Sequence, residues 1–351
     1  MADKNLPPME YRFLGRTGLL VSVISLGGWL TYGGHVGDER TFECMKAAYD
    51  AGINFFDTAE GYAGGQSEIV MGKAIKKFGW KRQDLVISTK IYHGQANARD
   101  PNNPINNKGL SRKHIIEGLD LSLKRLDLDY VDVVYAHRPD RHTPMEEVVR
   151  AFNHVINTGK AFYWGTSEWT ASEIAEAWRI ADRLGLIGPV VEQPQYNLLT
   201  RERVEGEYRW LYEAHGLGLT VFSPLKQGIL TGKYNDQPAP PPGSRLAEDK
   251  GQFTTNFAKT FGDETWQKNL AIVARLKPIA EELQATLAQL ALAWALKNPN
   301  VSSLITGASR PEQIYENVRA LEVAKKLTPE ILERIEEVLQ NKPKAEPLRF
   351  S

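Results

Sequence analysis

Eight short apolar runs, each followed by a segment with helical spacing, constrain the fold of this chain more than any other feature. Several runs are continuous in Val, Ile and Phe, as expected of parallel strands that are buried on both faces. Eight such units in one alternation favour a closed (β/α)8 barrel over an open doubly wound sheet. The runs are VSVISLG (21–27), INFFDTA (53–59), LVISTK (85–90), VDVVYAH (131–137), AFYWGTS (161–167), VVEQPQY (190–196), LTVFSP (219–224) and SSLITGA (302–308).

Boundary signals support this division of the chain. Gly52 is predicted to close the first helix, Ser111 to cap a helix after the third run, and Thr328 to cap a C-terminal helix outside the eightfold repeat. The GRTG of YRFLGRTGLLVSVI predicts a hairpin that closes the barrel floor. No GxGxxG opens a helix after the first run, which counts against a Rossmann domain. We therefore expect one domain over 1–351, with its core at about 11–340.

Two loops are longer than a minimal repeat needs. The segment 92–109 is Asn-rich and polar, and 235–257 is Pro-rich and then charged. Both follow strand runs, so we expect both on the face where the strands end, as parts of a substrate pocket or a lid. Plain flexible insertions are the alternative reading of the same composition.

Charge and cysteine content exclude several classes of protein. Lys+Arg and Asp+Glu both number 43, so no net basic field draws the chain to nucleic acid or anionic lipid. No apolar stretch approaches the roughly 20 residues that cross a bilayer, and the N-terminus lacks the apolar core of a signal peptide. Cys44 is the only cysteine, so no intrachain disulfide forms and no metal site is predicted. We expect a cytoplasmic globular protein without membrane insertion.

Four polar residues stand at or just past the ends of three successive strand runs: Asp57, Tyr62, Lys90 and His137. Parallel strands in a barrel end on one face, so these side chains are expected to meet. Tyrosine has a pKa of about 10, a poor match for proton donation at neutral pH. A nearby ammonium lowers that pKa, and Lys90 is the candidate for it.

Asp57 is expected to pair with Lys90, because an unpaired buried charge is costly. His137 is expected to orient a substrate oxygen through a hydrogen bond. Taken singly, each of these residues is more simply an ordinary polar strand end. Together they predict a proton donor for a carbonyl group.

The chain resembles the aldo-keto reductases through DTAEGY, the lysine that ends the third run, YAHRPD and GTSEW. It is most similar to the branch that contains the potassium-channel β-subunits, through GRTGL, GLSRKHIIEGL, TPMEE, FSPL, GILTGKY and GAS followed by EQ and EN. The resemblance spans nearly the whole chain. It implies a (β/α)8 TIM barrel with an N-terminal hairpin and an extra C-terminal helix, NADP(H) extended across the strand ends, and reduction of aldehydes or ketones.

The resemblance also implies roles for single residues. Tyr62 corresponds to the general acid, Lys90 to the group that modulates its pKa, Asp57 to the partner of Lys90, and His137 to the substrate-orienting residue. Ser167 and Gln193 correspond to residues that hold the nicotinamide carboxamide. The residues implied to bind the cofactor are Gly28, Trp29, Asp57, Ser167, Gln193, Phe222, Ser223, Pro224, Leu225, Gly228, Lys233, Gly307, Ser309, Gln313, Glu316 and Asn317.

The family pattern favours NADPH over NADH. A helix that begins near Pro311 is expected to bind the 2′-phosphate with its N-terminus, and Arg310 adds charge. Gln313 and Asn317 are otherwise solvated helix positions. The substrate is expected at Trp29, Tyr62, Tyr92 and His137, with Trp169 as a further candidate for an aromatic wall; packing of these aromatic residues within their loops is the alternative.

Two functional classes compete, namely an NADPH-dependent carbonyl reductase and a cytoplasmic channel β-subunit that senses the NADP(H) redox state. A cofactor-binding scaffold without turnover is a third class, which the complete four-residue set disfavours. His137 favours the enzyme, because channel subunits usually have Asn there. The short segment before Tyr11 points the same way, since many channel subunits carry a long extension. Glu168 stands where that branch usually has Arg, without a functional interpretation. The branch also implies a homotetramer.

Overall fold

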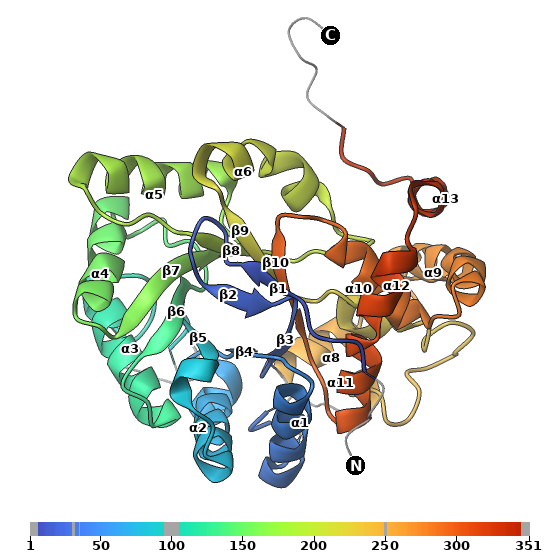
Figure 1. Ribbon diagram of the computed structural model, residues 1–351, viewed down its shortest axis with the longest axis horizontal. Helices are drawn as coiled ribbons and strands as arrows, with labels where there is room; N and C mark the ends of the chain where they lie inside the picture. Colours follow the sequence, from blue (N-terminus) through green and yellow to red (C-terminus); the bar gives the residue numbers. More distant parts are fainter. Residues whose placement is uncertain (1–5, 30–31, 35, 95–104, 249–250, 345–351) are drawn as a thin grey trace, which may run out of the picture.

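Eight parallel strands close into a barrel in the order β10-β3-β4-β5-β6-β7-β8-β9 (Figure 1). The structure is a computed structural model that describes residues 6–29, 32–34, 36–94, 105–248 and 251–344. Each strand overlaps one of the eight predicted runs, so the barrel is confirmed. The strands are β3 (Ile24–Gly27), β4 (Phe55–Asp57), β5 (Val86–Ile91), β6 (Val131–Ala136), β7 (Ala161–Ser167), β8 (Val191–Gln193), β9 (Gly218–Val221) and β10 (Val301–Thr306).

Helices surround the barrel and cover the outward face of its strands (Figure 1). Those that follow the strands in the repeat are α1 (Asp38–Asp50), α2 (Gln66–Phe78), α3 (Arg112–Leu126), α4 (Met145–Asn157), α5 (Ala171–Leu184), α6 (Arg209–His215), α9 (Glu264–Glu282), α10 (Leu287–Leu296) and α11 (Pro311–Val318), and α12 (Ala320–Lys326) and α13 (Pro329–Leu339) complete the chain. None of the described helices is both long and apolar enough to cross a membrane.

The strands bury both faces, which explains their continuous apolar sequences. In β6, Val133 and Tyr135 point into the barrel, where they pack with Phe55. Val134 and Ala136 belong instead to the larger core between strands and helices. This alternation follows from the two-residue period of a strand.

The predicted helix boundaries are confirmed. The side chain of Ser111 accepts a hydrogen bond from the backbone N–H of His114 at 3.2 Å, and Thr328 caps α13 in the same way. Gly52 follows the last residues of α1 with a φ of +87°. Glycine adopts this left-handed backbone without strain, so it ends the helix at low cost.

A hairpin closes the amino-terminal end of the barrel, as predicted. Strands β1 (Tyr11–Phe13) and β2 (Leu20–Ser22) pair antiparallel. Leu14 from the connecting turn packs into the barrel interior. Gly15, at φ +53°, approaches so closely that a Cβ there would lie 2.5 Å from the carbonyl oxygen of Val190. The turn is therefore the floor of the barrel.

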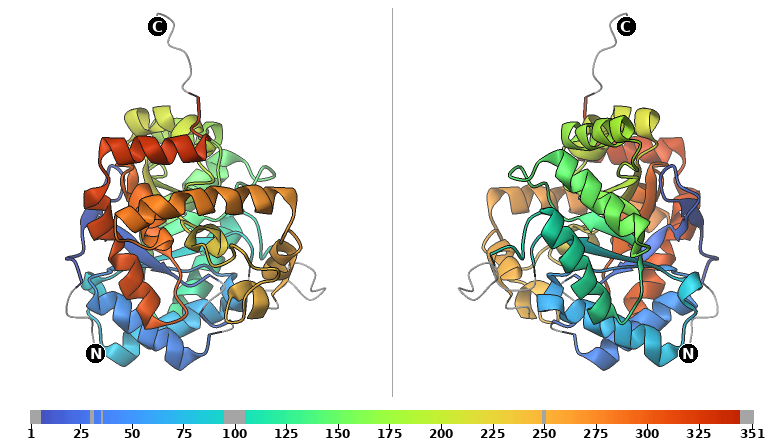
Figure 2. Two further views of the ribbon diagram at one scale, coloured as in Figure 1. Left: turned by 90° about the vertical axis from the view of Figure 1, so that its right-hand side faces the viewer. Right: turned by 90° about the vertical axis from the view of Figure 1, so that its left-hand side faces the viewer.

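The long insertion after β9 contains α7 (Arg245–Glu248) and α8 (Gln252–Ala258). It lies on the opposite side of the barrel from the hairpin (Figure 2). Gly243 and Glu248 from this insertion line a cavity at the carboxyl ends of the strands. This part of the insertion therefore lies on the face where the strands end, as expected. The other predicted loop, 92–109, is described only at its ends, because 95–104 lie outside the described residues.

Candidate active site

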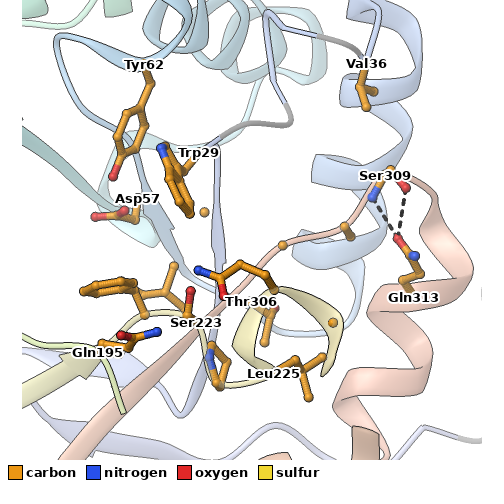
Figure 3. A pocket seen from close by; sticks show the side chains of 18 of the residues that line it. Trp29, Val36, Asp57, Tyr62, Gln195, Ser223, Leu225, Thr306, Ser309 and Gln313 are labelled. Atoms are coloured by element: carbon orange, nitrogen blue, oxygen red, sulfur yellow. Dashed lines mark hydrogen bonds between the residues drawn. The ribbon is translucent and has the colours of Figure 1, made fainter. Parts of the chain in front are cut away.

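The carboxyl ends of the strands surround an elongated cavity of about 960 Å³. This is at the upper end of the range of about 300–1,000 Å³ typical of small-molecule and cofactor sites. Asp57 and Tyr62 lie towards one end, and Ser309 and Gln313 lie towards the other (Figure 3). His137 also lines the cavity, and Lys90 is fully buried against Asp57 and Tyr62. The four residues singled out from the sequence therefore meet.

Strand register brings Asp57 and Lys90 together. Parallel pairing of β4 and β5 sets Asp57 beside Ser88. Lys90 is two residues further along, so it points to the same side of the sheet as Ser88. The Oδ1 atom of Asp57 accepts hydrogen bonds from Ser88 Oγ at 2.6 Å and Gln193 Nε2 at 3.2 Å. These contacts fix the carboxylate beneath the cavity.

The Lys90 ammonium uses all three of its donors within this site. Its Nζ lies 2.5 Å from Asp57 Oδ2, 2.8 Å from the carbonyl oxygen of Thr58 and 3.1 Å from the hydroxyl of Tyr62. Burial lowers the pKa of Lys90, but Asp57 and Tyr62 together raise it by more, so the net pKa is above its ordinary value. The amine is therefore charged at neutral pH and aimed at the phenol.

The net pKa of Tyr62 differs in direction from the sequence-based expectation. Burial raises the pKa of the phenol above 10, and Lys90 lowers it only in part. The expectation considered the ammonium but not the burial of the phenol. Tyr62 therefore keeps its proton through the neutral range, which a proton donor requires.

Tyr62 begins a turn with unusual backbone geometry. Ala63, Gly64 and Gly65 all have positive φ, at 48°, 62° and 92°. A left-handed alanine is strained, and such strain is concentrated at functional sites. The turn brings a residue five positions beyond the strand end back over Lys90.

His137 is a neutral imidazole in this setting. Burial, followed by the charges of Lys90 and Arg138, holds its pKa well below 6.5. Its ring meets that of Tyr62 edge to face at a centroid distance of 5.6 Å. The buried Nδ1 atom has no hydrogen-bond partner within the part of the chain that the structure describes. A neutral imidazole with one protonated nitrogen can donate a hydrogen bond to a carbonyl oxygen.

Most of the residues implied to bind the cofactor line the cavity, and three do not. The backbone N–H of Gly28 donates to the backbone carbonyl oxygen of Asp57, and a Cβ on Gly28 would lie 2.3 Å from Ser67 Oγ. Glu316 accepts a hydrogen bond from Thr286, and Asn317 is buried on α11. The implied residues that line the cavity are Trp29, Asp57, Ser167, Gln193, Phe222, Ser223, Pro224, Leu225, Gly228, Lys233, Gly307, Ser309 and Gln313.

The loop after β9 has the geometry of a cradle. Lys226, Gln227 and Gly228 are successive left-handed residues, with φ of 47°, 49° and 92°. A Cβ on Gly228 would lie 2.7 Å from Lys233 Cε, so glycine leaves room for that side chain beside the cavity. The Oε1 atom of Gln227, which lines the same cavity, is buried without a partner among the described residues. Lys233 adds a cation to this part of the cavity, so a polar ligand that carries negative charge fits the loop.

The far end of the cavity lies at the start of α11. Ser309 donates its backbone N–H to Gln313 Oε1 at 2.8 Å, so the two residues form one unit (Figure 3). The helix begins at Pro311, as predicted, and the positive end of its dipole favours an anion. Arg310 is outside the cavity lining and lies 4.0 Å from Glu312.

The expected aromatic wall is only partly formed. Trp29 lines the cavity. Tyr92 instead packs its ring edge to face against the ring of His93, with a centroid distance of 5.0 Å. Trp169 is 1% exposed and packs in the core between strands and helices.

Sequence reasoning missed several lining residues. His93, Arg138 and Gln195 each lie two positions beyond a strand end and line the cavity. The strand-end rule that found Lys90 and His137 would have found these as well. Arg40 also lines the cavity but belongs to α1, and no sequence signal indicates it.

Glu168 acquires a structural role. Its φ is +59°, directly after the end of β7. The carboxylate accepts the backbone N–H of Gln195 at 2.8 Å and pairs with Arg203 at 3.1 Å. Glu168 therefore holds the segment that carries Gln195 against the cavity.

Comparison with known proteins finds a family model and relatives that match most of this chain. The model of the Aldo/keto reductase family matches residues 23–340. A probable voltage-gated potassium channel subunit beta from Arabidopsis thaliana is 53% identical over 336 residues, covering 96% of this chain and 98% of that protein. A putative voltage-gated potassium channel subunit beta from Schizosaccharomyces pombe is 56% identical over 345 residues, covering 97% and 95%.

Proposed function

Since the chain belongs to the aldo/keto reductase family, we propose that it is an NADPH-dependent carbonyl reductase that converts aldehydes or ketones to alcohols. The observation that carries this proposal is the contact of 3.1 Å between the Lys90 ammonium and the Tyr62 hydroxyl at the wall of the cavity. A protonated phenol held by a charged amine beside a neutral imidazole is suited to protonating a carbonyl oxygen.

The cavity lining supports an extended dinucleotide. When bound, NADPH supplies a hydride from C4 of its nicotinamide to the carbonyl carbon. Ser167 and Gln193 would hold the carboxamide and Phe222 would stack on the ring. The loop 223–233, with Lys233, would hold the pyrophosphate. Ser309 and Gln313 at the start of α11 would hold the adenosine end, where the helix N-terminus favours the 2′-phosphate of NADPH.

Each residue of the catalytic set then has one task. Tyr62 gives its hydroxyl proton to the substrate oxygen while the carbon accepts the hydride, which completes the alcohol. Lys90 stabilises the negative charge that develops on the phenol, and Asp57 keeps Lys90 in place. His137 orients the same substrate oxygen with a hydrogen bond.

The direct test is turnover. Purified protein mixed with NADPH and a panel of aliphatic and aromatic aldehydes should consume NADPH, with the matching alcohol formed in equal amount. The same panel with NADH measures the cofactor preference, and NADPH should give the higher kcat/KM. Tight binding of NADPH without turnover of any aldehyde would refute the reductase assignment.

The pH dependence follows from the two shifted groups. The pKa of His137 lies well below 6.5 and that of Tyr62 lies above 10. Neither group changes its charge between about pH 6.5 and 9, so kcat/KM should stay level over that range. The rate should fall only when higher pH removes the Tyr62 proton. A profile measured with an uncharged aldehyde checks this, and a loss of activity centred near pH 7 would contradict it.

A second candidate function comes from the names of the relatives. Proteins named as potassium channel β-subunits match this chain over nearly its full length. On that basis the chain would be a cytoplasmic regulatory subunit that senses NADP(H), and a homotetramer. Light scattering tests the tetramer. Co-purification with a potassium channel in an NADP(H)-dependent manner, without aldehyde turnover, would favour this function over the first.

A further inference from the structure

Arg138 is a cation at the catalytic end of the cavity that the proposed mechanism does not use. It follows His137 at the end of β6 and lines the cavity. Its Nη1 donates to the backbone oxygen of His137 at 2.5 Å and to Ser167 Oγ at 3.3 Å. Both acceptors are uncharged groups, so the positive charge of Arg138 is not neutralised by them.

No carboxylate of the described residues forms an ion pair with Arg138. Arg40, which lines the same cavity, is paired with Glu43 at 3.0 Å. The charge of Lys90 is likewise compensated by Asp57, whose Oδ2 lies 2.5 Å from Lys90 Nζ. Arg138 therefore contributes an uncompensated charge to the wall of the cavity. Its Nε and Nη2 donors make no hydrogen bond to the described protein and remain available to a ligand.

The field of Arg138 reaches the groups around the reaction centre. Its charge contributes to lowering the pKa of His137 and of His93, and it acts in the same direction on Tyr62. These three side chains line the cavity and are uncharged at neutral pH. The guanidinium is thus close to where a substrate carbonyl would lie. Because the three neighbouring side chains are uncharged, Arg138 supplies the net charge at this end of the cavity.

We propose that Arg138 gives this site a preference for carbonyl substrates that carry a carboxylate, an inference that rests on the reductase function proposed above. A guanidinium presents parallel N–H donors that match the two oxygens of a carboxylate. Because the protein holds Nη1, the N–H groups of Nε and Nη2 form the edge of the guanidinium that can bind a carboxylate. The substrate class is therefore oxo acids in which the carboxylate lies far enough from the carbonyl to reach Arg138 while the carbonyl faces Tyr62.

The competing role for Arg138 is to hold the backbone of His137 and the hydroxyl of Ser167. An uncharged amide donor would satisfy both of these acceptors equally well. Such a role would affect all substrates alike, and through Ser167 it would also affect the cofactor. The two roles are separated by comparing substrates that differ only in charge.

The experiment uses two aromatic aldehydes of nearly the same shape, 4-carboxybenzaldehyde and uncharged 4-nitrobenzaldehyde. Their kcat/KM ratio is measured in the wild type, Arg138→Met and Arg138→Lys, and the ratio cancels any common effect on catalysis. We expect Arg138→Met to lower the ratio about 10- to 100-fold, since hydrogen bonds to charged groups are of this strength. Arg138→Lys should give an intermediate ratio, because lysine keeps the positive charge but lacks the parallel N–H donors of the guanidinium.

Arg141→Met is the matched control. Arg141 lies three residues further on, is largely exposed and pairs with Glu173 at 3.2 Å. This variant removes the same net charge, so it reveals any effect of long-range attraction alone. The ratio should not change. Rising salt should lower the ratio in the wild type and not in Arg138→Met.

A binding measurement keeps the inference separate from the reductase function. The NADP⁺ complex is titrated with 4-(hydroxymethyl)benzoate and with 4-nitrobenzyl alcohol, the two alcohol products. If aldehydes are not reduced but binding of 4-(hydroxymethyl)benzoate depends on Arg138, the reductase function is refuted and the anion site is supported. If both aldehydes are reduced and Arg138→Met leaves the ratio unchanged, the anion site is overturned and the reductase stands. A weaker affinity for NADPH with an unchanged ratio would assign Arg138 to the cofactor.

Discussion

Replacing Tyr62 by phenylalanine should lower kcat for aldehyde reduction by about 10²- to 10⁴-fold, the usual contribution of a positioned general acid. The hydroxyl is the one atom of this side chain that can give a proton to the substrate, and it is also the atom that Lys90 contacts at 3.1 Å. The ring that phenylalanine retains still fills the wall of the cavity. NADPH affinity should therefore change little, because the hydroxyl acts in the transition state.

The measurement is steady-state kinetics with one good aldehyde, together with NADPH titration of each protein. Lys90 keeps its contacts with Asp57 and Thr58 in the variant, so the ammonium remains held. A similar melting temperature would confirm that the fold is intact. Retention of more than a tenth of the wild-type kcat would show that another group donates the proton.

Replacing Lys90 by methionine should destabilise the protein by about 3–5 kcal/mol in addition to abolishing reduction. Lys90 is 0% exposed and Asp57 is 2% exposed, so the variant leaves a buried carboxylate without its cation. Removal of one partner of a buried pair is costly for this reason. At an unfolding entropy of about 2.1 cal/mol/K per residue, the melting temperature of the 351-residue chain should fall by about 4–7 °C.

The double variant Asp57→Asn with Lys90→Met tests the cause of that loss. An uncharged asparagine can keep the hydrogen bond with Ser88 without needing a cation. The double variant should therefore regain most of the lost thermal stability while remaining inactive, because Tyr62 still lacks its ammonium. Double and single variants that melt at the same temperature would show that packing of the lysine stem, rather than its charge, stabilises this site.

Much of the fold was predictable because it depends on local periodicity. Continuous apolar runs identify strands buried on both faces, and residues such as Ser111 and Gly52 mark helix ends by their own backbone chemistry. Asp57, Lys90 and His137 could be placed on one face because parallel strands in a closed barrel all end there. Their roles were expected from the chemistry of the residues and implied by the family resemblance, and they are proposals that the variants above test.

Burial could not be predicted in the same way, because it depends on segments far apart in the sequence. The expected lowering of the Tyr62 pKa by Lys90 is outweighed by desolvation that only the assembled cavity produces. Trp169 is polar at one end and follows a strand, yet it packs in the core. Glu316 lies on the same helix as Gln313 but contacts Thr286 rather than the cavity. Which way a side chain points is decided by its neighbours in space.

The sequence by itself determined the order of the strands, the closed barrel and the face on which the polar strand ends gather, since these follow from alternation and spacing along the chain. The tertiary structure alone decided which of those polar groups are charged and which are paired. Lys90 lies against Asp57 and is neutralised, whereas Arg138 lies among uncharged groups at the cavity wall. The reason is that charge compensation depends on distances of a few ångströms between residues that the sequence separates by dozens.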